Sequence, residues 1–245
     1  MQNKDLSWKI YSLLPIVLIL IFLTLLPLVS IFYNSFFDIR WKDGGYIYNF
    51  IGFQNYLELP QNKFYVPGLI NTIKLAIIGV SFQMIFGFVI ALGISKIKKG
   101  KSFFVSLFLL PILLPPIVIG SIWRLMYGFD FGIFNYLLAF LGVFPIDWLG
   151  DPTLAFVSVV ILDVWHWTPF VVLLLLAGLE SLPTDVYEAG RVDGTSGWSE
   201  IVHITFPLMI PTIIVTLVFR FILSFKVFDE IYLLTQGGPG TSTEV

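Results

Sequence analysis

Five long apolar segments constrain the fold of this chain more than any other feature. They occupy approximately residues 10–37, 69–95, 103–127, 154–179 and 207–234. Each is long enough to cross a hydrocarbon core of about 30 Å as an α-helix. Only 12% of the residues are charged, against about 25% in soluble domains, and the mean hydropathy is +0.90. We therefore predict an all-α, polytopic membrane helix bundle that forms a single domain over residues 1–245.

Two of the connecting regions carry further local signals. Pro111, Pro115 and Pro116 lie inside the third apolar segment and predict a kinked helix there, because proline removes a backbone donor. Residues 38–67, between the first two segments, are mixed in polarity and aromatic. They contain side chains suited to a membrane–water boundary, namely Trp41, Tyr46, Tyr48, Phe50 and Tyr56.

The 181–206 loop is the only long polar stretch in the second half of the chain, so it must lie outside the lipid. Its pattern predicts two short helices joined by a sharp turn. Thr184 is a candidate cap for the first helix. Asp193-Gly194 then forms the turn, where glycine adopts positive φ without steric cost.

The second short helix of the loop is expected to begin at Ser196, a candidate cap. Four of its side chains then follow one another at helical spacing and predict one apolar face: Trp198, Ile201, Val202 and Thr205. Phe206-Pro207 is expected to end this helix, because the residue before a proline is disfavoured in the α region. The loop therefore reads as a bent, amphipathic projection that requires a binding partner.

The distribution of basic residues predicts a cytoplasmic N-terminus, since short cytoplasmic loops are enriched in lysine and arginine. In this orientation the inside segments hold Lys4, Lys9, Lys96, Lys98, Lys99, Lys101 and Arg191. The outside segments hold only Arg40, Lys42 and Lys63. The 181–206 loop is then cytoplasmic.

Several functional classes receive no support from the sequence. The absence of cysteine excludes disulfides, thiolate metal sites and cysteine nucleophiles. Residues 95–102 nearly match a phosphate-binding loop, but Ser95 replaces the first glycine and two membrane segments flank the stretch. No histidine or carboxylate cluster has metal-ligand spacing, and the net charge of −2 gives no indication of nucleic-acid binding. We expect no catalytic residue, no metal and no cofactor.

Residues of the 181–206 loop carry a resemblance to a known family. Glu188-Ala189-Gly190 is followed after three residues by Gly194, nine residues lie between Gly194 and Ile204, and Pro207 comes three positions later. This is similar to the loop signature of permease subunits in binding-protein-dependent ABC importers. Gly190 replaces the usual second alanine and Phe206 the usual leucine. The glycine is expected to loosen the first short helix by up to about 1 kcal/mol.

Other stretches resemble the carbohydrate-transporting branch of that family, which includes maltose and glycerol-phosphate permeases. They are Phe53-Gln54-Asn55-Tyr56, Asn71-Thr72, residues 163–170, residues 228–232 and residues 234–239. The resemblance implies a permease of the type I importer fold, which has six spanning helices. Only five segments are present here, so we expect the last helix to be missing through truncation.

The resemblance also implies partners and site residues. The partners would be a second permease, two ATP-binding subunits, an extracytoplasmic solute-binding protein and a sugar-like solute. The chain itself would not be an enzyme, since ATP hydrolysis would reside in the partner. The residues implied in coupling to the ATPase are Glu188, Ala189, Gly190, Asp193, Gly194, Trp198, Ile204 and Pro207.

Ionisable residues inside the apolar segments are costly and therefore functional candidates. Asp163 and His166 are one helical turn apart in the fourth segment, with Trp165 and Trp167 beside them. In one interpretation these four residues line a sugar path, where the rings stack on the sugar and the polar groups bond to its hydroxyls. In the other, Asp163 and His166 hydrogen-bond to each other between helices. Arg220 would pair with Asp229, with Glu230 or with another segment.

Two other functional classes remain open at this stage. An ion-coupled secondary transporter would need acidic residues at mid-membrane and inverted repeats, and Asp163 without a visible repeat is thin support for it. A membrane-embedded assembly protein without transport activity is the third possibility. Co-purification with an ATPase would separate the importer subunit from both.

Overall fold

The computed structural model describes residues 2–245, with side chains from Tyr11 onward, and the chain divides into two compact units, Met1–Tyr65 and Val66–Val245. Lys4 and Lys9, which contribute to the predicted orientation, have side chains outside the described set. The single domain expected over residues 1–245 stays a prediction. Helices dominate both units, and the one exception among the described residues is a two-stranded hairpin in the first unit.

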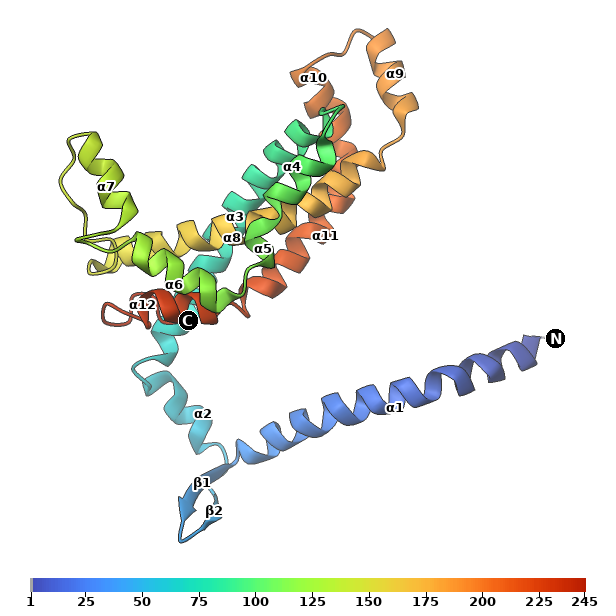
Figure 1. The fold of residues 1–245 in the computed structure, drawn as a ribbon. Helices are drawn as coiled ribbons and strands as arrows, with labels where there is room; N and C mark the ends of the chain where they lie inside the picture. The colour runs from blue at the N-terminus through green and yellow to red at the C-terminus, as the bar shows by residue number, and fades with distance from the viewer. Residues whose placement is uncertain (1) are drawn as a thin grey trace. The chain divides into compact units, whose positions relative to one another are not determined.

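The first unit consists of a long helix, the hairpin and a short helical segment (Figure 1). Its elements are α1 (Gln2–Asn34), β1 (Phe37–Lys42), β2 (Gly45–Phe50), α2 (Gln54–Glu58) and the 3-10 turn η1 (Leu59–Gln61). From Tyr11 to Asn34, α1 is apolar and long enough to cross a membrane, and its described side chains are largely exposed. Such a helix has the length and composition of a membrane span.

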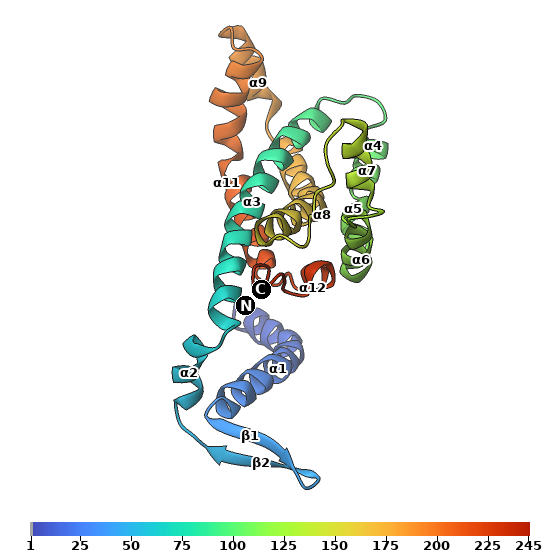
Figure 2. The ribbon, with the colours of Figure 1, turned by 90° about the vertical axis from the view of Figure 1, so that its left-hand side faces the viewer.

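The second unit is a bundle arranged around α8 (Figures 1 and 2). In chain order it contains α3 (Tyr65–Ser95), α4 (Lys101–Phe108), α5 (Leu110–Leu113), α6 (Pro116–Met126), α7 (Ile133–Phe140), α8 (Pro152–Glu180), α9 (Thr184–Val192), α10 (Trp198–Glu200), the π-turn η2 (Ile201–Thr205), α11 (Phe206–Ser224) and α12 (Asp229–Thr235). The amino end of α8 is capped by Asp151, whose carboxylate accepts from the amides of Thr153 and Leu154. Two apolar clusters form the core. One lies around Leu75, Trp123 and Leu162, and the other around Leu175 and Met209.

Glycines allow the helices of this bundle to approach closely. A Cβ atom on Gly79 would lie 2.6 Å from Asp163 Oδ2, and one on Gly120 would lie 2.7 Å from the carbonyl oxygen of Glu230. Small residues have this role in membrane bundles, where tight van der Waals packing replaces the hydrophobic effect between helices. The short helix α12 is thereby held directly against α6.

The third apolar segment, expected as one kinked helix over 103–127, is broken into α4, α5 and α6. Leu114 and Pro115 have extended backbone with ψ of 138° and 137°. The physical reason is that each precedes a proline, and Pro115 and Pro116 push their predecessors out of the α region. Four helices in the described part of the chain are long and apolar enough to cross a membrane, and this broken segment is not among them.

Candidate functional site

The 181–206 loop forms one end of the second unit, where α9 lies beyond the carboxyl end of α8 (Figures 1 and 2). Its turn after α9 is a Schellman motif. The amide of Thr195 donates to the carbonyl of Gly190 at 2.9 Å, and the amide of Gly194 donates to Arg191 at 3.1 Å. Gly194 has φ of +81°, which a residue with a side chain rarely adopts. The turn predicted at Asp193-Gly194 is therefore present.

Gly190 is buried against the second arm of the loop. A Cβ atom there would overlap Ile204 Cδ1 and lie 2.7 Å from Thr195 Oγ1. The departure from the family's alanine therefore has a packing consequence: it lets α9 lie directly on Ile204. Tyr187 Oη adds a hydrogen bond of 3.1 Å to Thr205 Oγ1 between the same two arms. The loop is thus a folded hairpin of helices.

Both predicted caps of the loop are wrong. Thr184 is already inside α9, whose N-cap is Pro183, and no side chain caps it. Gly197 with φ of +58°, rather than Ser196, precedes α10, again without a side-chain cap. Pro183 is fixed in extended backbone and takes the N-cap position, which leaves Thr184 inside the first turn, where its hydroxyl does not cap the helix.

The expected helix end at Phe206-Pro207 is also wrong. α10, η2 and α11 are continuous from Trp198 to Ser224. Proline removes one amide from the helix ladder, and here the ladder widens into a π-turn just before it, in which the amide of Phe206 bonds to the carbonyl of Ile201. The widened turn accommodates Pro207 as the second residue of α11, where the intrahelical amide partner is missing in any case. One arm of the loop is consequently the direct extension of a membrane helix.

The outer surface of the loop carries apolar side chains without packing partners. Val192 is 87% exposed and Trp198 is 76% exposed. The expected apolar face is divided, because Thr205 is buried and Ile201 half-buried while Val202 and Trp198 face outward. Glu188, Ala189, Asp193 and Gly194 are all exposed. Exposed apolar groups ringed by polar ones are typical of a protein-binding surface.

A cleft of about 380 Å³ lies between the loop and the ends of α3 and α8. Its walls mix charged and apolar groups, including Lys96, Glu180, Glu188, Arg191 and Glu200. Lys101, at the start of α4, makes an ion pair with Glu180 at the end of α8. This pair links the basic loop after α3 to the base of the 181–206 loop.

A buried polar cluster lies at the middle of the bundle and joins four helices. It consists of Gln83, Asp163, His166, Trp167, Arg220 and Glu230.

In one half of the cluster, Arg220 of α11 donates from Nη2 to Asp163 Oδ1 at 2.7 Å and from Nε to Gln83 Oε1 at 2.6 Å. Gln83 Nε2 then donates to Asp163 Oδ2 at 2.7 Å, which closes a ring of three side chains from α3, α8 and α11. All three are completely buried. Arg220 also stacks 4.8 Å from the centre of the Trp167 ring, and its Nη1 has no hydrogen-bond partner among the described residues.

In the other half, Glu230 of α12 is bound by two neighbouring residues of α8. Its Oε1 lies 3.1 Å from His166 Nδ1 and accepts from Trp167 Nε1 at 3.3 Å. Both His166 and Glu230 are buried. Buried charges must be paired, since an isolated ion in low dielectric is strongly unfavourable. The cluster therefore fixes α12 and α11 to α8.

These contacts match one of the pairings considered for the sequence and not the other. Asp163 and His166 do not satisfy each other: each bonds to residues of other helices. Arg220 pairs with another segment, through Asp163, rather than with Asp229 or Glu230. Gln83 was not anticipated at all, although an amide inside a long apolar helix is a signal that such a group has a partner.

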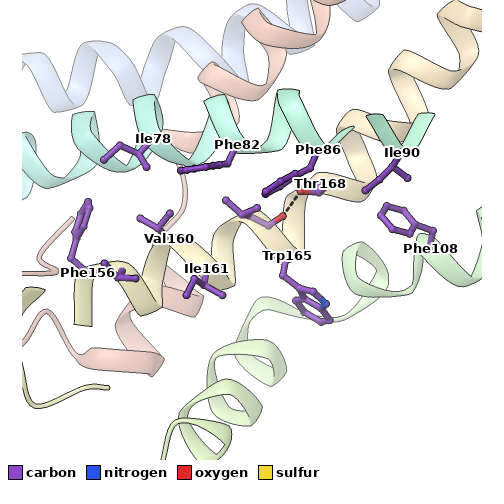
Figure 3. A pocket seen from close by; sticks show the side chains of 12 residues that line it. Ile78, Phe82, Phe86, Ile90, Phe108, Phe156, Val160, Ile161, Trp165 and Thr168 are labelled. Atoms are coloured by element: carbon purple, nitrogen blue, oxygen red, sulfur yellow. Dashed lines mark hydrogen bonds between the residues drawn. The ribbon is translucent and has the colours of Figure 1, made fainter. Parts of the chain in front are cut away.

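Trp165 points away from the cluster and lines an apolar cavity of about 640 Å³ (Figure 3). The cavity lies between α3 and α8 and is closed on one side by Phe108 of α4. Phe82 and Phe86 line its α3 wall, and the hydroxyl of Thr168 is already bonded to the carbonyl of Val164. Trp165 itself is 40% exposed. Of the four predicted path residues, it alone lines this opening.

The carboxyl-terminal segment of the chain is held by Asn71 of α3. Asn71 Nδ2 donates to the carbonyls of Thr241 and Glu244 at 2.9 and 3.1 Å. Thr243 is buried and bonds to Thr235 and to the carbonyl of Gly238. Asn71, quoted for the family resemblance, thus binds the segment that follows the quoted stretch 234–239, and Thr243 of this segment bonds back to that stretch. No group of His, Cys, Asp or Glu able to hold a metal ion occurs among the described residues.

Comparison with known proteins is consistent with this arrangement. Residues 83–243 match the model of the family described as binding-protein-dependent transport system inner membrane component. The chain is 38% identical over 233 residues to the trehalose/maltose transport system permease protein MalF of Thermococcus litoralis, covering 94% of this chain and 78% of the relative. It is 33% identical to the sulfoquinovosyl glycerol transport system permease protein SmoG of Agrobacterium fabrum, covering 94% and 75%.

The fold is also found in a solved structure. The chain superposes with a TM-score of 0.81, at 22% identity, on a chain of a bacterial alginate ABC transporter in complex with an alginate pentasaccharide-bound periplasmic protein. The superposition covers 99% of this chain and 81% of that chain. The predicted fold class, a helical importer permease, is confirmed by this likeness together with the family match.

Proposed function

Because this chain belongs to the family of binding-protein-dependent transport system inner membrane components, we propose that it forms the solute path of an ATP-driven importer together with a second permease. The family itself is a transport component of the membrane. In this proposal ATP is hydrolysed by two separate ATP-binding subunits, and an extracytoplasmic protein delivers the solute. The two units of the chain belong to one permease domain.

The proposed solute is a sugar or a related polar molecule. Two relatives are named as permeases for trehalose/maltose and for sulfoquinovosyl glycerol, and the solved structure is that of an alginate transporter. These names support a carbohydrate as the solute class. An ion-coupled secondary transporter is not favoured, since it would need a different family and inverted repeats.

We propose that the 181–206 loop is the cytoplasmic element that couples this chain to the ATPase, through the residues named for it above. The observation that carries the proposal is the unbroken helix from Trp198 to Ser224. A push on the exposed Trp198 passes along this one helix to Arg220 and the polar cluster. In this arrangement Glu188 and Asp193 bond to the partner, while Gly190, Gly194, Ile204 and Pro207 set the shape of the loop.

Within the bundle, we propose that Trp165 contacts the solute and that Asp163, His166 and Trp167 position the helices around the path. Trp165 lines the apolar cavity, where its ring is available for stacking on a sugar face. The other three are engaged with Arg220, Gln83 and Glu230. The second permease would supply the opposite wall and most hydroxyl partners.

The test of coupling is the Gly194→Val variant in the assembled importer. Valine at φ of +81° is strained, so the turn between α9 and α10 should be redirected while the membrane helices remain. We expect normal amounts of assembled complex, ATP hydrolysis that no longer responds to the loaded binding protein, and loss of uptake. Gly194→Asn is the matched control, because asparagine tolerates this backbone region. Normal uptake in the valine variant would refute the coupling role.

A further inference from the structure

The hairpin of the first unit has two chemically different faces. Asp43 and Gly44 have φ of +51° and +82°, as expected for a two-residue type I′ turn. That turn fixes the register, in which Phe37 is paired with Phe50, Ile39 with Tyr48 and Trp41 with Tyr46. Because side chains alternate along a strand, these three pairs share one side, here called the aromatic face.

The other side of the hairpin is mainly polar. It holds Asp38, Arg40, Lys42, Gly45, Ile47 and Asn49. Asp38 and Arg40 form an ion pair of 2.8 Å on this side, and Ile47 is its only large apolar residue. The charges therefore lie on one side of a thin two-stranded sheet and the aromatic rings on the other.

The aromatic face is exposed in the structure. Trp41 is 65% exposed, Tyr46 64% and Phe50 72%. Across the strands the rings contact one another, with Trp41 and Tyr46 at 4.8 Å and Phe37 and Phe50 at 5.4 Å between centroids. A two-stranded hairpin is marginally stable alone in water, and this one would expose a continuous aromatic surface there.

The hairpin is held close to the end of a membrane helix. Only Ser35 and Phe36 separate Asn34, the last residue of α1, from β1, so the strand begins within about 11 Å of the helix end. Asn55 of α2 donates to the carbonyls of Ser35 and Phe37 at 2.8 and 3.3 Å. β1 follows α1 closely in the chain (Figure 1), and Phe37 of the aromatic face packs against Tyr33 of α1, with 4.8 Å between the ring centroids.

We propose that the aromatic face of the hairpin docks onto the membrane interface of the leaflet in which α1 ends. Tryptophan and tyrosine favour the headgroup level, where an apolar ring and a polar edge are both accommodated. The polar face then meets water. A lipid surface fits better than a sugar, because small-molecule sites are concave and carry a few precisely placed polar groups, whereas this face is one side of a two-stranded sheet whose only polar side-chain atoms are the indole nitrogen and the tyrosine hydroxyls.

The test uses spin labels in the full chain reconstituted in phospholipid vesicles, and the absence of native cysteine makes single labels straightforward. Tyr48→Cys reports on the aromatic face and Asn49→Cys on the polar face. Relaxation by oxygen, which partitions into lipid, is compared with relaxation by a water-soluble nickel chelate. We expect the oxygen-to-nickel ratio at position 48 to be several-fold higher than at 49 but to stay below that of a label replacing Leu20, which is exposed on α1 and lies well inside the spanning segment.

Equal ratios at 48 and 49 would overturn the proposal. Two other results would also overturn it. Loss of access to both relaxants at position 48 would indicate that another protein binds the aromatic face, and a change in relaxation on adding oligosaccharide would indicate that a sugar binds there. Tyr46→Cys and Ile47→Cys form a second pair across the same hairpin. This pair gives the same contrast if a label at 48 disturbs the fold.

Discussion

The polar cluster and the 181–206 loop lie on the same two helices, α8 and α11, but they are built in opposite ways. In the cluster, charged side chains are completely buried and nearly every polar atom is bonded to another helix. In the loop, the backbone is fixed by a glycine turn while the apolar tips at Val192 and Trp198 are exposed. The cluster therefore holds the helices together, whereas the loop presents exposed side chains to a partner. Substitutions should separate these roles.

The largest effect on stability is expected from breaking the ion pair of the cluster. Arg220→Met leaves Asp163 buried without its cation, which typically costs about 3–5 kcal/mol. We expect a large drop in the thermal unfolding midpoint of the purified chain in detergent. The matched control is the double variant Asp163→Asn and Arg220→Met, in which no unpaired charge remains and most of the loss should be recovered. A double variant as unstable as Arg220→Met alone would show that charge pairing is not the cause.

A smaller loss of stability is expected where two helices are in close contact at a glycine. Gly120→Val places atoms against the backbone of Glu230, and overpacking of this kind costs about 1–3 kcal/mol. The unfolding midpoint should fall, and α12 should exchange its amide hydrogens faster. Gly93→Val is the control, since Gly93 in α3 has no neighbouring atom within 4 Å of a Cβ. Equal effects at the two positions would contradict the close packing of α6 and α12.

Removing the hydrogen bonds from Asn71 to the carboxyl-terminal segment should have a local effect. Asn71→Ala removes two hydrogen bonds to the carbonyls of Thr241 and Glu244, worth about 1 kcal/mol each. Hydrogen exchange in residues 237–245 should accelerate, while α8 and α11 remain protected. Unchanged exchange in that segment would mean that Asn71 does not hold it.

The smallest effect on stability is expected at the tip of the loop. Trp198→Ala removes an exposed side chain, and such changes usually alter the free energy of unfolding by no more than about 0.5 kcal/mol. Uptake by the assembled importer should nevertheless fall sharply, because the surface offered to the partner is lost. A variant with normal uptake would place the partner contact elsewhere on the loop.

The two regions also differ in how far they can be predicted from sequence. The turn at Gly194 follows from adjacent residues, because a helix that ends in a glycine with positive φ needs only local hydrogen bonds. The cluster depends on Gln83, Asp163 and Arg220, which are far apart in the chain and meet only when the bundle forms. The sequence shows that these polar residues stand inside apolar segments, where they are costly, but it does not show which of them meet.

Local rules failed where the fold supplied an alternative. Phe206-Pro207 was expected to end a helix. Instead, the hydrogen-bond ladder widens into a π-turn before Pro207, and the helix continues into α11. Conversely, the prolines of the third segment did more than kink it, because two consecutive residues had to leave the α region. The hairpin after α1 was not anticipated, since its aromatic residues suggested a boundary location without specifying strands.

The most direct test of the coupling proposal is a photo-crosslink from position 198 in the native membrane. Trp198 is replaced by a photoreactive phenylalanine analogue, and the products are identified by mass spectrometry. The account predicts a crosslink to an ATP-binding subunit that changes in yield when ATP is bound. A crosslink to an extracytoplasmic protein, or to lipid alone, would contradict it.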